Sequence, residues 1–175
     1  GPVTVEGADT RLQVTRGGDR TLVAVAHRAH GDLRAADVDA ALAARRGWVD
    51  AAARRAGLAG RAAGVKALRQ LKGQVYAPEG IFARRWSTPD RWPHRGCWLW
   101  DSAFHAIGAR HVDAALARDL IGAVLDGQRA DGFIPIRSDP DGARGERFTQ
   151  PPTLVLACWT LSQSAPDPAW LRAVL

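Results

Sequence analysis

Two long segments rich in glycine and proline, residues 77–100 and 129–152, most constrain the fold of this chain, because both interrupt regions of helical periodicity. Neither segment shows the alternation of a strand or the three- and four-residue spacing of a helix. Loops of this length without secondary structure are uncommon and are usually functional. The sequence therefore predicts an all-α layout in which every second connection between helices is long.

The apolar residues outside these two loops predict six helices. Their spacing of three and four residues, with Asp or Ser near the start and Gly near the end, is typical of amphipathic helices. We expect helices over residues 37–57, with Asp37 as the cap, and over 62–76, 101–111, 113–128 and 153–163. A last helix opens at Asp167 and Pro168 and shows no stop signal, so we expect the chain to be the N-terminal piece of something larger.

The first 36 residues predict a β-hairpin. Apolar and polar residues alternate from Leu12 to Val25, and the RGGD sequence at residues 16–19 supplies the turn. Because a two-stranded hairpin is marginal in water, we expect it to be the tail of a sheet domain or an edge docked on another element. The predicted organisation is a hairpin in 1–36, a linker helix in 37–60 and a helical domain in 61–175.

Composition excludes several classes of protein. With 175 residues, 46% of them hydrophobic, the chain is long enough for one globular domain with a core. The formal net charge is +6, but acidic and basic residues are interspersed without long runs, so no nucleic-acid partner is expected. No apolar run approaches the roughly 20 residues of a membrane span, and the first residues lack the pattern of a signal peptide. We expect a cytoplasmic chain with no membrane partner.

The two cysteines, Cys97 and Cys158, lie far apart in the sequence, without a CxxC motif and without paired histidines. This spacing predicts buried thiols rather than zinc ligands, and it leaves a disulfide between the two open. We expect no metal and no cofactor.

Three ordered motifs carry a resemblance to a known enzyme family. They are TPDRWPHRGCWLWDSAFHAIG from Thr88, GQRADGFIP from Gly127 and TQPPTLVLACW from Thr149. Together with the helical pattern between Leu68 and Leu161, they resemble glycoside hydrolase family 63, the group of processing α-glucosidases and mannosylglycerate or glucosylglycerate hydrolases.

The resemblance implies an (α/α)6 toroid, six helical hairpins arranged in two rings, often preceded by a β-sandwich. On this interpretation residues 1–36 are a β-hairpin remnant of the sandwich, and residues 61–175 are only the N-terminal part of the toroid. The apolar faces around Val155, Trp159 and Leu171 would then be uncovered. We expect the remaining part of the glycosidase domain, or a second copy in a homodimer, to cover them.

The resemblance also implies an inverting glycoside hydrolase, in which one carboxylic acid protonates the leaving oxygen and a second carboxylate activates water. Both groups come later in the family's sequence, so no catalytic residue is predicted in this chain, and neither Glu79 nor Asp90 is assigned one of these roles. The expected substrate is an α-linked glucoside or mannoside, or a glycoside of a small acid such as glycerate. The alternative is a non-catalytic carbohydrate-binding or scaffold protein with the same toroid.

The substrate-binding residues predicted first are Trp98, Trp100 and Asp101. A sugar offers apolar C–H faces and a set of hydroxyls, so a sugar subsite needs flat aromatic surface and a fixed acceptor. With the family match, Asp101 becomes the carboxylate that accepts two sugar hydroxyls. The alternative is that Asp101 caps a helix starting at Ser102. His105, one helical turn later, can share this face or can be a satisfied core histidine.

Two further residues complete the predicted set. Gln150 resembles a glutamine that the family places in its pocket, and its amide can donate to and accept from a hydroxyl; the alternative is a simple helix-start residue. Phe133 is predicted to form part of the wall, positioned by a turn at Asp131 and Gly132. For Trp86 and Trp92 on the first long loop, the sequence leaves core packing and a lining role equally open.

Overall fold

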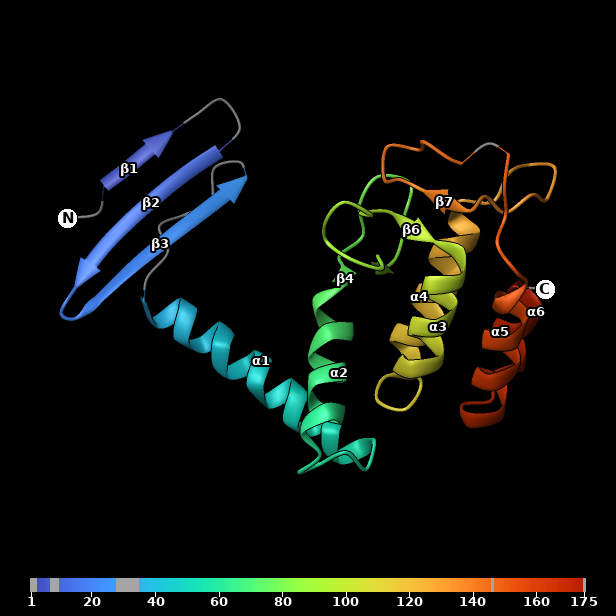
Figure 1. The fold of residues 1–175 in the computed structure, drawn as a ribbon, viewed down its shortest axis with the longest axis horizontal. Helices are drawn as coiled ribbons and strands as arrows, with labels where there is room; N and C mark the ends of the chain where they lie inside the picture. The colour runs from blue at the N-terminus through green and yellow to red at the C-terminus, as the bar shows by residue number, and fades with distance from the viewer. Residues whose placement is uncertain (1–2, 7–9, 28–34, 146, 175) are drawn as a thin grey trace. The chain divides into compact units, whose positions relative to one another are not determined.

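The computed structural model describes residues 3–6, 10–27, 35–145 and 147–174. Within that part the chain is helix-rich, has small antiparallel sheets and forms two compact units, Gly1–Trp48 and Val49–Leu175 (Figure 1). The helices are α1 (Ala35–Arg55), α2 (Ala62–Gly73), α3 (Leu99–Ala109), α4 (Ala114–Asp126), α5 (Thr153–Ser164) and α6 (Pro168–Val174). The strands are β1 (Val3–Glu6), β2 (Thr10–Gly17), β3 (Arg20–His27), β4 (Val75–Tyr76), β5 (Trp86–Ser87), β6 (Cys97–Trp98) and β7 (Arg137–Ser138).

In the first unit, β1, β2 and β3 form an antiparallel sheet in that order. The predicted hairpin is confirmed: β2 and β3 pair along their whole length, and their register closes at Gly17 and Arg20. The prediction of two strands was nevertheless wrong, because β1 adds a third that pairs with β2. This strand has only four residues, too short a run for alternation to distinguish it from a loop.

One face of this sheet is apolar yet open to solvent. Residues paired across antiparallel strands point to the same face. The register therefore puts six apolar side chains on one face, namely Val3, Val5, Leu12, Val14, Val23 and Val25. Val25 is 70% exposed and Val3 is 63% exposed, whereas Gln13 and Ala24 on the opposite face are buried. The sheet thus buries its more polar side and exposes its apolar one.

Helix α1 begins at Ala35, two residues before the predicted cap, so Asp37 lies in its first turn and the cap prediction was wrong. The side chains of residues 39–47 are all exposed, and burial resumes at Val49, Ala52 and Ala53. The division between the two units falls inside this helix, after Trp48. The predicted borders at residues 36 and 60 stay predictions.

The second unit is built around α3, which packs against α4 and α5 (Figure 1). Its core contains side chains from these helices and from the first long loop, among them Phe82, Trp86, Leu116, Leu120, Ile121 and Leu161. Trp86 is fully buried and stacks on Tyr76 with ring centroids 4.7 Å apart, so this tryptophan belongs to the core. Trp92, in contrast, is 85% exposed. Because α4 and α5 both pack against α3, these contacts fix the position of its first turn in the second unit.

The later helices agree with their predicted positions, except at some ends. Asp113 caps α4 by accepting a hydrogen bond from the Leu116 backbone N–H at 2.9 Å, and Asp167 caps α6 in the same way. Helix α5 begins at Thr153 as predicted. Helix α2 stops at Gly73, short of the predicted residue 76, because Val75 and Tyr76 pair with β5 instead.

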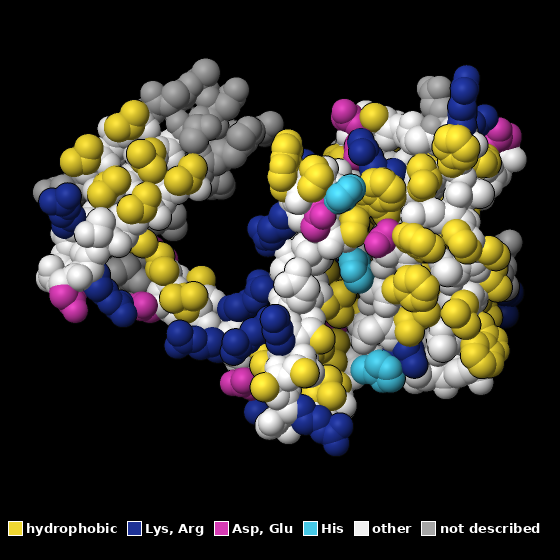
Figure 2. Space-filling view, in the orientation of Figure 1, with side chains coloured by type: hydrophobic (Ala, Val, Ile, Leu, Met, Phe, Trp, Pro, Cys, Tyr) yellow, Lys and Arg dark blue, Asp and Glu magenta, His cyan; other side chains and the backbone are white. Residues whose placement is uncertain are grey.

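Apolar side chains gather on the surface over α3 and α5 (Figure 2). Val155 is 65% exposed and Trp159 is 59% exposed, as predicted for an uncovered face, and Phe104 on α3 is 52% exposed. The prediction was wrong for Leu171, which is half-buried and packs against the core.

Candidate functional site

The site predicted around Asp101 lies where β6 runs directly into α3. The backbone of Trp98 is extended and forms the N-cap without a side-chain hydrogen bond, so α3 starts at Leu99. Trp98 pairs with Arg137 in β7, and the Leu99 N–H donates to the Ile136 carbonyl at 3.2 Å. Asp101 is therefore the third residue of the helix, and the alternative that it caps a helix starting at Ser102 is wrong.

The second long loop returns to this helix start through Gln150. The backbone N–H of Trp100 donates to Oε1 of Gln150 at 2.9 Å. This bond satisfies one of the N–H groups that the first turn of a helix leaves without a partner. The structure thus brings Gln150 to Trp100, 50 positions away in sequence. Its amide oxygen accepts this hydrogen bond from the helix, and its amide nitrogen remains a potential donor.

Asp101 is half-buried in the first turn of α3. Burial raises the pKa of its carboxyl group, while hydrogen bonds from its own backbone and from the side chain of Trp100, and the charge of His94, act in the opposite direction. The positive end of the helix dipole also favours an anion at this position. The result is a fixed acceptor beside Trp100, which keeps 41% of its surface exposed.

Trp98 is held by the loop that precedes it. Its indole Nε1 donates to the His94 carbonyl at 3.1 Å, and the His94 ring meets it edge-on with centroids 6.0 Å apart. Asp90 in turn accepts from the His94 backbone N–H at 2.9 Å and contacts its Nδ1 at 2.8 Å. Sequence reasoning missed this Asp90–His94 pair; the four-residue spacing between an acid and a histidine in the same motif was the signal available.

His105 does not join Asp101 in the way that the shared helix face suggested. Its Nδ1 lies 2.9 Å from Oγ of Ser87, and burial lowers its pKa, which favours the neutral ring. From Ser87 a buried chain continues through Ser102, 3.4 Å away, to the Cys97 thiol, 3.5 Å further. This arrangement fits the alternative of a satisfied core histidine and ties α3 to β5 and β6.

The contacts of Phe133 are made within its own loop. The predicted turn is present: the Phe133 N–H donates to Oδ1 of Asp131 at 3.1 Å, and the Arg129 guanidinium lies 5.3 Å from the ring centroid. These contacts belong to the loop after α4. Among the described residues, no hydrogen bond or ring contact joins Phe133 to the other five predicted residues.

Both thiols are buried and free, so the disulfide left open by the sequence is not formed. Burial raises the pKa of Cys97 to about 12 and also raises that of Cys158. Within the described ranges, no group of three or more His, Cys, Asp or Glu side chains is placed to hold a metal ion. None of the helices described is sufficiently long and apolar to cross a membrane.

The arrangement at the start of α3 combines two indoles with one half-buried carboxylate and an amide. Residues 94–175 match the family model of the mannosylglycerate hydrolase MGH1-like glycoside hydrolase domain. This match supports a glycoside hydrolase of the mannosylglycerate hydrolase type. It begins at His94, so it includes all six predicted sugar-binding residues. No curated protein matches the chain.

Chemically, the site can bind a polyhydroxyl compound. The indoles of Trp98 and Trp100 supply apolar surface, and ionised Asp101 accepts hydrogen bonds only, which suits sugar hydroxyls as donors. An inverting hydrolysis requires two carboxyl groups about 6.5–9.5 Å apart. Among the described residues, no hydrogen bond or ion pair joins Asp101 to a second acidic side chain.

Proposed function

We propose that this chain is part of an inverting glycoside hydrolase that acts on an α-linked glucoside or mannoside, or on a glycoside of a small acid such as glycerate. In this proposal the chain supplies sugar-binding residues, and the catalytic acid and base lie outside residues 1–175. The observation that carries it is the position of Asp101, half-buried in the first turn of α3 beside Trp100, inside the segment that matches the glycoside hydrolase family model.

The proposed fold is the N-terminal part of an (α/α)6 toroid of family 63, with the β1–β2–β3 sheet as a remnant of a preceding β-sandwich. Two exposed apolar surfaces support it. Val155 and Trp159 leave one side of α5 uncovered, and the valine-rich face of the sheet is uncovered too. Further helices of a toroid would cover the first surface, and a second sheet, packed about 10 Å away, would cover the other.

The experiment is a calorimetric titration of the chain with mannosylglycerate and glucosylglycerate, compared with its Asp101→Asn and Asp101→Ala variants. We expect either substitution to weaken binding by about tenfold or more, because charge-assisted hydrogen bonds to the sugar are lost. The thermal midpoint should change little, since an acid in the first turn of a helix contributes only about 0.3–1 kcal/mol. Binding that is equal in all three proteins would contradict the role of Asp101.

Hydrolysis separates the enzyme from the scaffold alternative. Residues 1–175 alone should not cleave an aryl α-glucoside. A form of the protein that carries additional helices should cleave it, and exchange of one carboxylate in the added part should abolish cleavage. If the extended form binds sugar but never cleaves a glycoside, the non-catalytic scaffold is the correct interpretation.

A further inference from the structure

The two long loops line an open hollow that the proposed function does not use. It has a volume of about 580 Å³, and its wall comes from the two long loops. We call it the loop cavity; its charged and aromatic lining consists of Glu79, Arg91, Trp92, Arg95, Arg137 with Asp139, and Asp141. None of the six predicted sugar-binding residues lines it, although all six lie within the described part of the chain.

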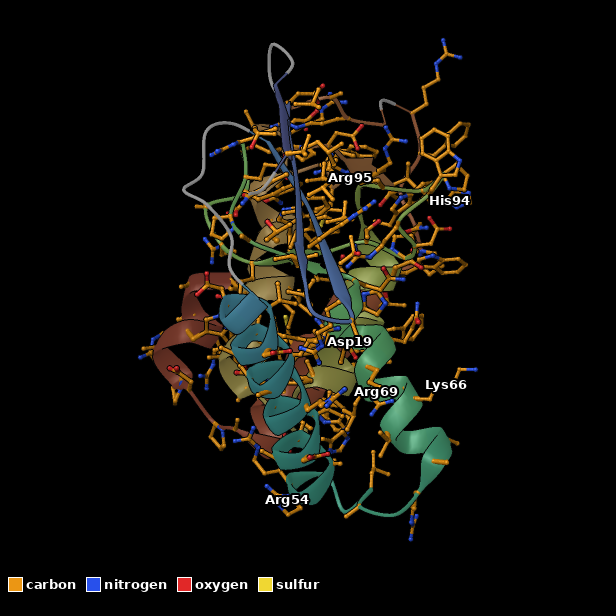
Figure 3. All side chains as sticks on the ribbon, turned by 90° about the vertical axis from the view of Figure 1, so that its left-hand side faces the viewer. Asp19, Arg54, Lys66, Arg69, His94 and Arg95 are labelled. Carbon is orange, nitrogen blue, oxygen red and sulfur yellow. The ribbon has the colours of Figure 1, made fainter. Side chains whose placement is uncertain are left out.

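The loop cavity adjoins the candidate site, because Arg137 lines the cavity and its guanidinium also lies 6.0 Å from the centroid of the Trp98 ring. His94 and Arg95 are neighbours in sequence, yet Figure 3 shows His94 near the edge of the view and Arg95 further in. His94 contacts Trp98, whereas the Arg95 guanidinium lies over the Tyr76 ring, 5.2 Å from its centroid, and lines the cavity. Consecutive residues of this loop therefore make different contacts, His94 with Trp98 and Arg95 with Tyr76 and the cavity.

The most unusual part of the lining is Trp92. It is 85% exposed, which leaves a large apolar surface in water. Trp86, on the same loop, is fully buried, so of these two tryptophans one belongs to the core and the other is exposed. A flat exposed indole next to a polar hollow is suited to the apolar C–H face of a pyranose ring, which leaves the ring hydroxyls for the walls.

The charges on the walls are balanced and mostly paired. Arg95 donates to Oε2 of Glu79 at 2.8 Å, and Arg137 is paired with Asp139. Arg91 donates to the Gly73 carbonyl at 3.1 and 2.6 Å.

Asp141 completes the set of three acidic and three basic side chains, and its Oδ1 accepts from the Ala143 N–H at 2.9 Å. An anion would meet the carboxylates at close range, and a cation would meet the guanidiniums. A neutral ligand that both donates and accepts hydrogen bonds fits these walls better than an ion does.

We propose that the loop cavity is a second carbohydrate subsite, in which a neutral pyranose stacks on Trp92 and exchanges hydrogen bonds with the arginine and carboxylate side chains of the walls. This subsite is additional to the proposed function, because it does not involve Asp101. A single sugar ring of this size binds with a Kd of about a millimolar at best, so the subsite adds to the binding of a longer or branched glycoside.

The test is a titration of the ¹⁵N-labelled chain with methyl α-D-mannopyranoside, followed by NMR. The indole N–H signal of Trp92, assigned by its loss in Trp92→Ala, should shift in a saturable way in the wild-type chain and equally in Asp101→Ala. The amide signals of Gly80 and Asp141, which also line the cavity, should shift with the same Kd. In Trp92→Ala, these two signals should report binding weakened by about tenfold or more.

The matched control is Trp159→Ala, which removes an exposed tryptophan on α5, 59% exposed and not part of the cavity lining. It should leave the Trp92 shift unchanged. Far-ultraviolet circular dichroism checks that each variant remains folded. A second titration, with inorganic phosphate, should leave the Trp92, Gly80 and Asp141 signals in place.

Three outcomes would overturn the proposal. In the first, the Trp92, Gly80 and Asp141 signals do not shift with the sugar. In the second, they shift only with phosphate, which would make the cavity an anion site. In the third, they no longer respond to the sugar in Asp101→Ala, which would make them part of the candidate site. Failure of the proposed function is a separate result, in which the Trp98 and Trp100 indole signals stay still while the Trp92 signal moves.

Discussion

At the scale of single residues, Asp101 has two properties that act on its proton in opposite directions. Burial favours the neutral acid and raises the pKa, whereas a sugar that donates hydroxyl hydrogens favours the carboxylate. An ordinary aspartate has a pKa near 3.8 and is already ionised above that pH. Asp101 still holds its proton at a somewhat higher pH, so there a sugar can bind only after this proton has left.

We predict that sugar affinity falls on acidification and begins to fall above the usual range of an aspartate. Once the pH is below the pKa of Asp101, the decrease approaches about tenfold for each pH unit. The dissociation constant measured between neutral and acidic pH tests this, with Asp101→Asn as the control, because its profile should be flat. Identical profiles for both proteins would mean that another group titrates.

The same raised pKa affects stability in the opposite direction: acid weakens sugar binding but increases the free energy of unfolding. The folded chain holds the Asp101 proton more tightly than the unfolded chain does, so this contribution to the free energy of unfolding is complete at low pH. It is lost as the pH rises through the folded-state pKa. We therefore expect that protonation of Asp101 weakens sugar binding without lowering the free energy of unfolding.

The thiols give a second prediction at this scale. Because burial raises the pKa of Cys97 to about 12, almost none of it is thiolate near neutral pH. Iodoacetamide should alkylate Cys97 and Cys158 far more slowly in the native chain than in urea. Single-thiol variants, Cys97→Ala and Cys158→Ala, allow the two rates to be measured separately by mass spectrometry. A native rate equal to that of a free cysteine would contradict the buried position.

At the scale of elements, the start of α3 depends on a residue from another loop. Gln150 supplies the acceptor that Trp98, as N-cap, cannot supply with its own side chain. We predict that Gln150→Ala lowers the free energy of unfolding by about 0.5–2 kcal/mol, the usual cost of removing a helix cap. Urea denaturation measures this difference.

Gln150→Glu is the informative second variant, because a carboxylate at a helix N-terminus accepts the Trp100 N–H at least as well. It should recover stability while losing the amide N–H that we assign to the ligand. Stability restored together with full sugar affinity would show that Gln150 acts only as a cap. Loss of stability in both variants would show that the contact with Trp100 is not what holds the helix.

Periodicity in the sequence located the helices of the second unit but not their first residues. A start at Asp101 or Ser102 was expected, yet β6 continues straight into α3, and the first turn is capped by Gln150, far away in the sequence. Such a long-range partner leaves no local pattern. Because α3 starts at Leu99, two or three residues earlier, Asp101 lies in its first turn and is not its cap.

The tryptophans show that the sequence also could not predict which side chains of the first long loop are buried. The sequence placed Trp86 and Trp92 on one loop and could not decide between core and lining roles for either. Packing decides: Trp86 stacks on Tyr76 inside the core, and Trp92 is in solvent. The motif around Trp98, Trp100 and Asp101 can be recognised in the sequence because its residues lie within four positions, whereas Ser87 and His105 come together only through the fold.

At the scale of the whole molecule, the uncovered side of α5 has a measurable effect. Val155 and Trp159 are both exposed on this side of α5. Monomeric proteins rarely expose large contiguous apolar patches. We predict that the isolated chain binds a dye that reports apolar surface, or self-associates in a concentration-dependent way. Analytical ultracentrifugation and dye fluorescence test this, with Trp159→Ser as the variant that should weaken both. A monomer that binds no dye would contradict it.

The exposed stretch of α1 makes this helix a weak point for proteases. Residues 39–47 form about two and a half helical turns without a single buried side chain, and the ion pair of Asp39 with Arg20 is itself exposed, so little tertiary packing keeps them helical. Arg45 and Arg46 lie within this stretch and offer trypsin its preferred bonds. Brief digestion should therefore cut there before it cuts inside α3 or α4, and mass spectrometry should find a resistant fragment that starts close to Val49. Early cleavage at Arg118 in α4 instead would show that the second unit opens more readily than this stretch of α1.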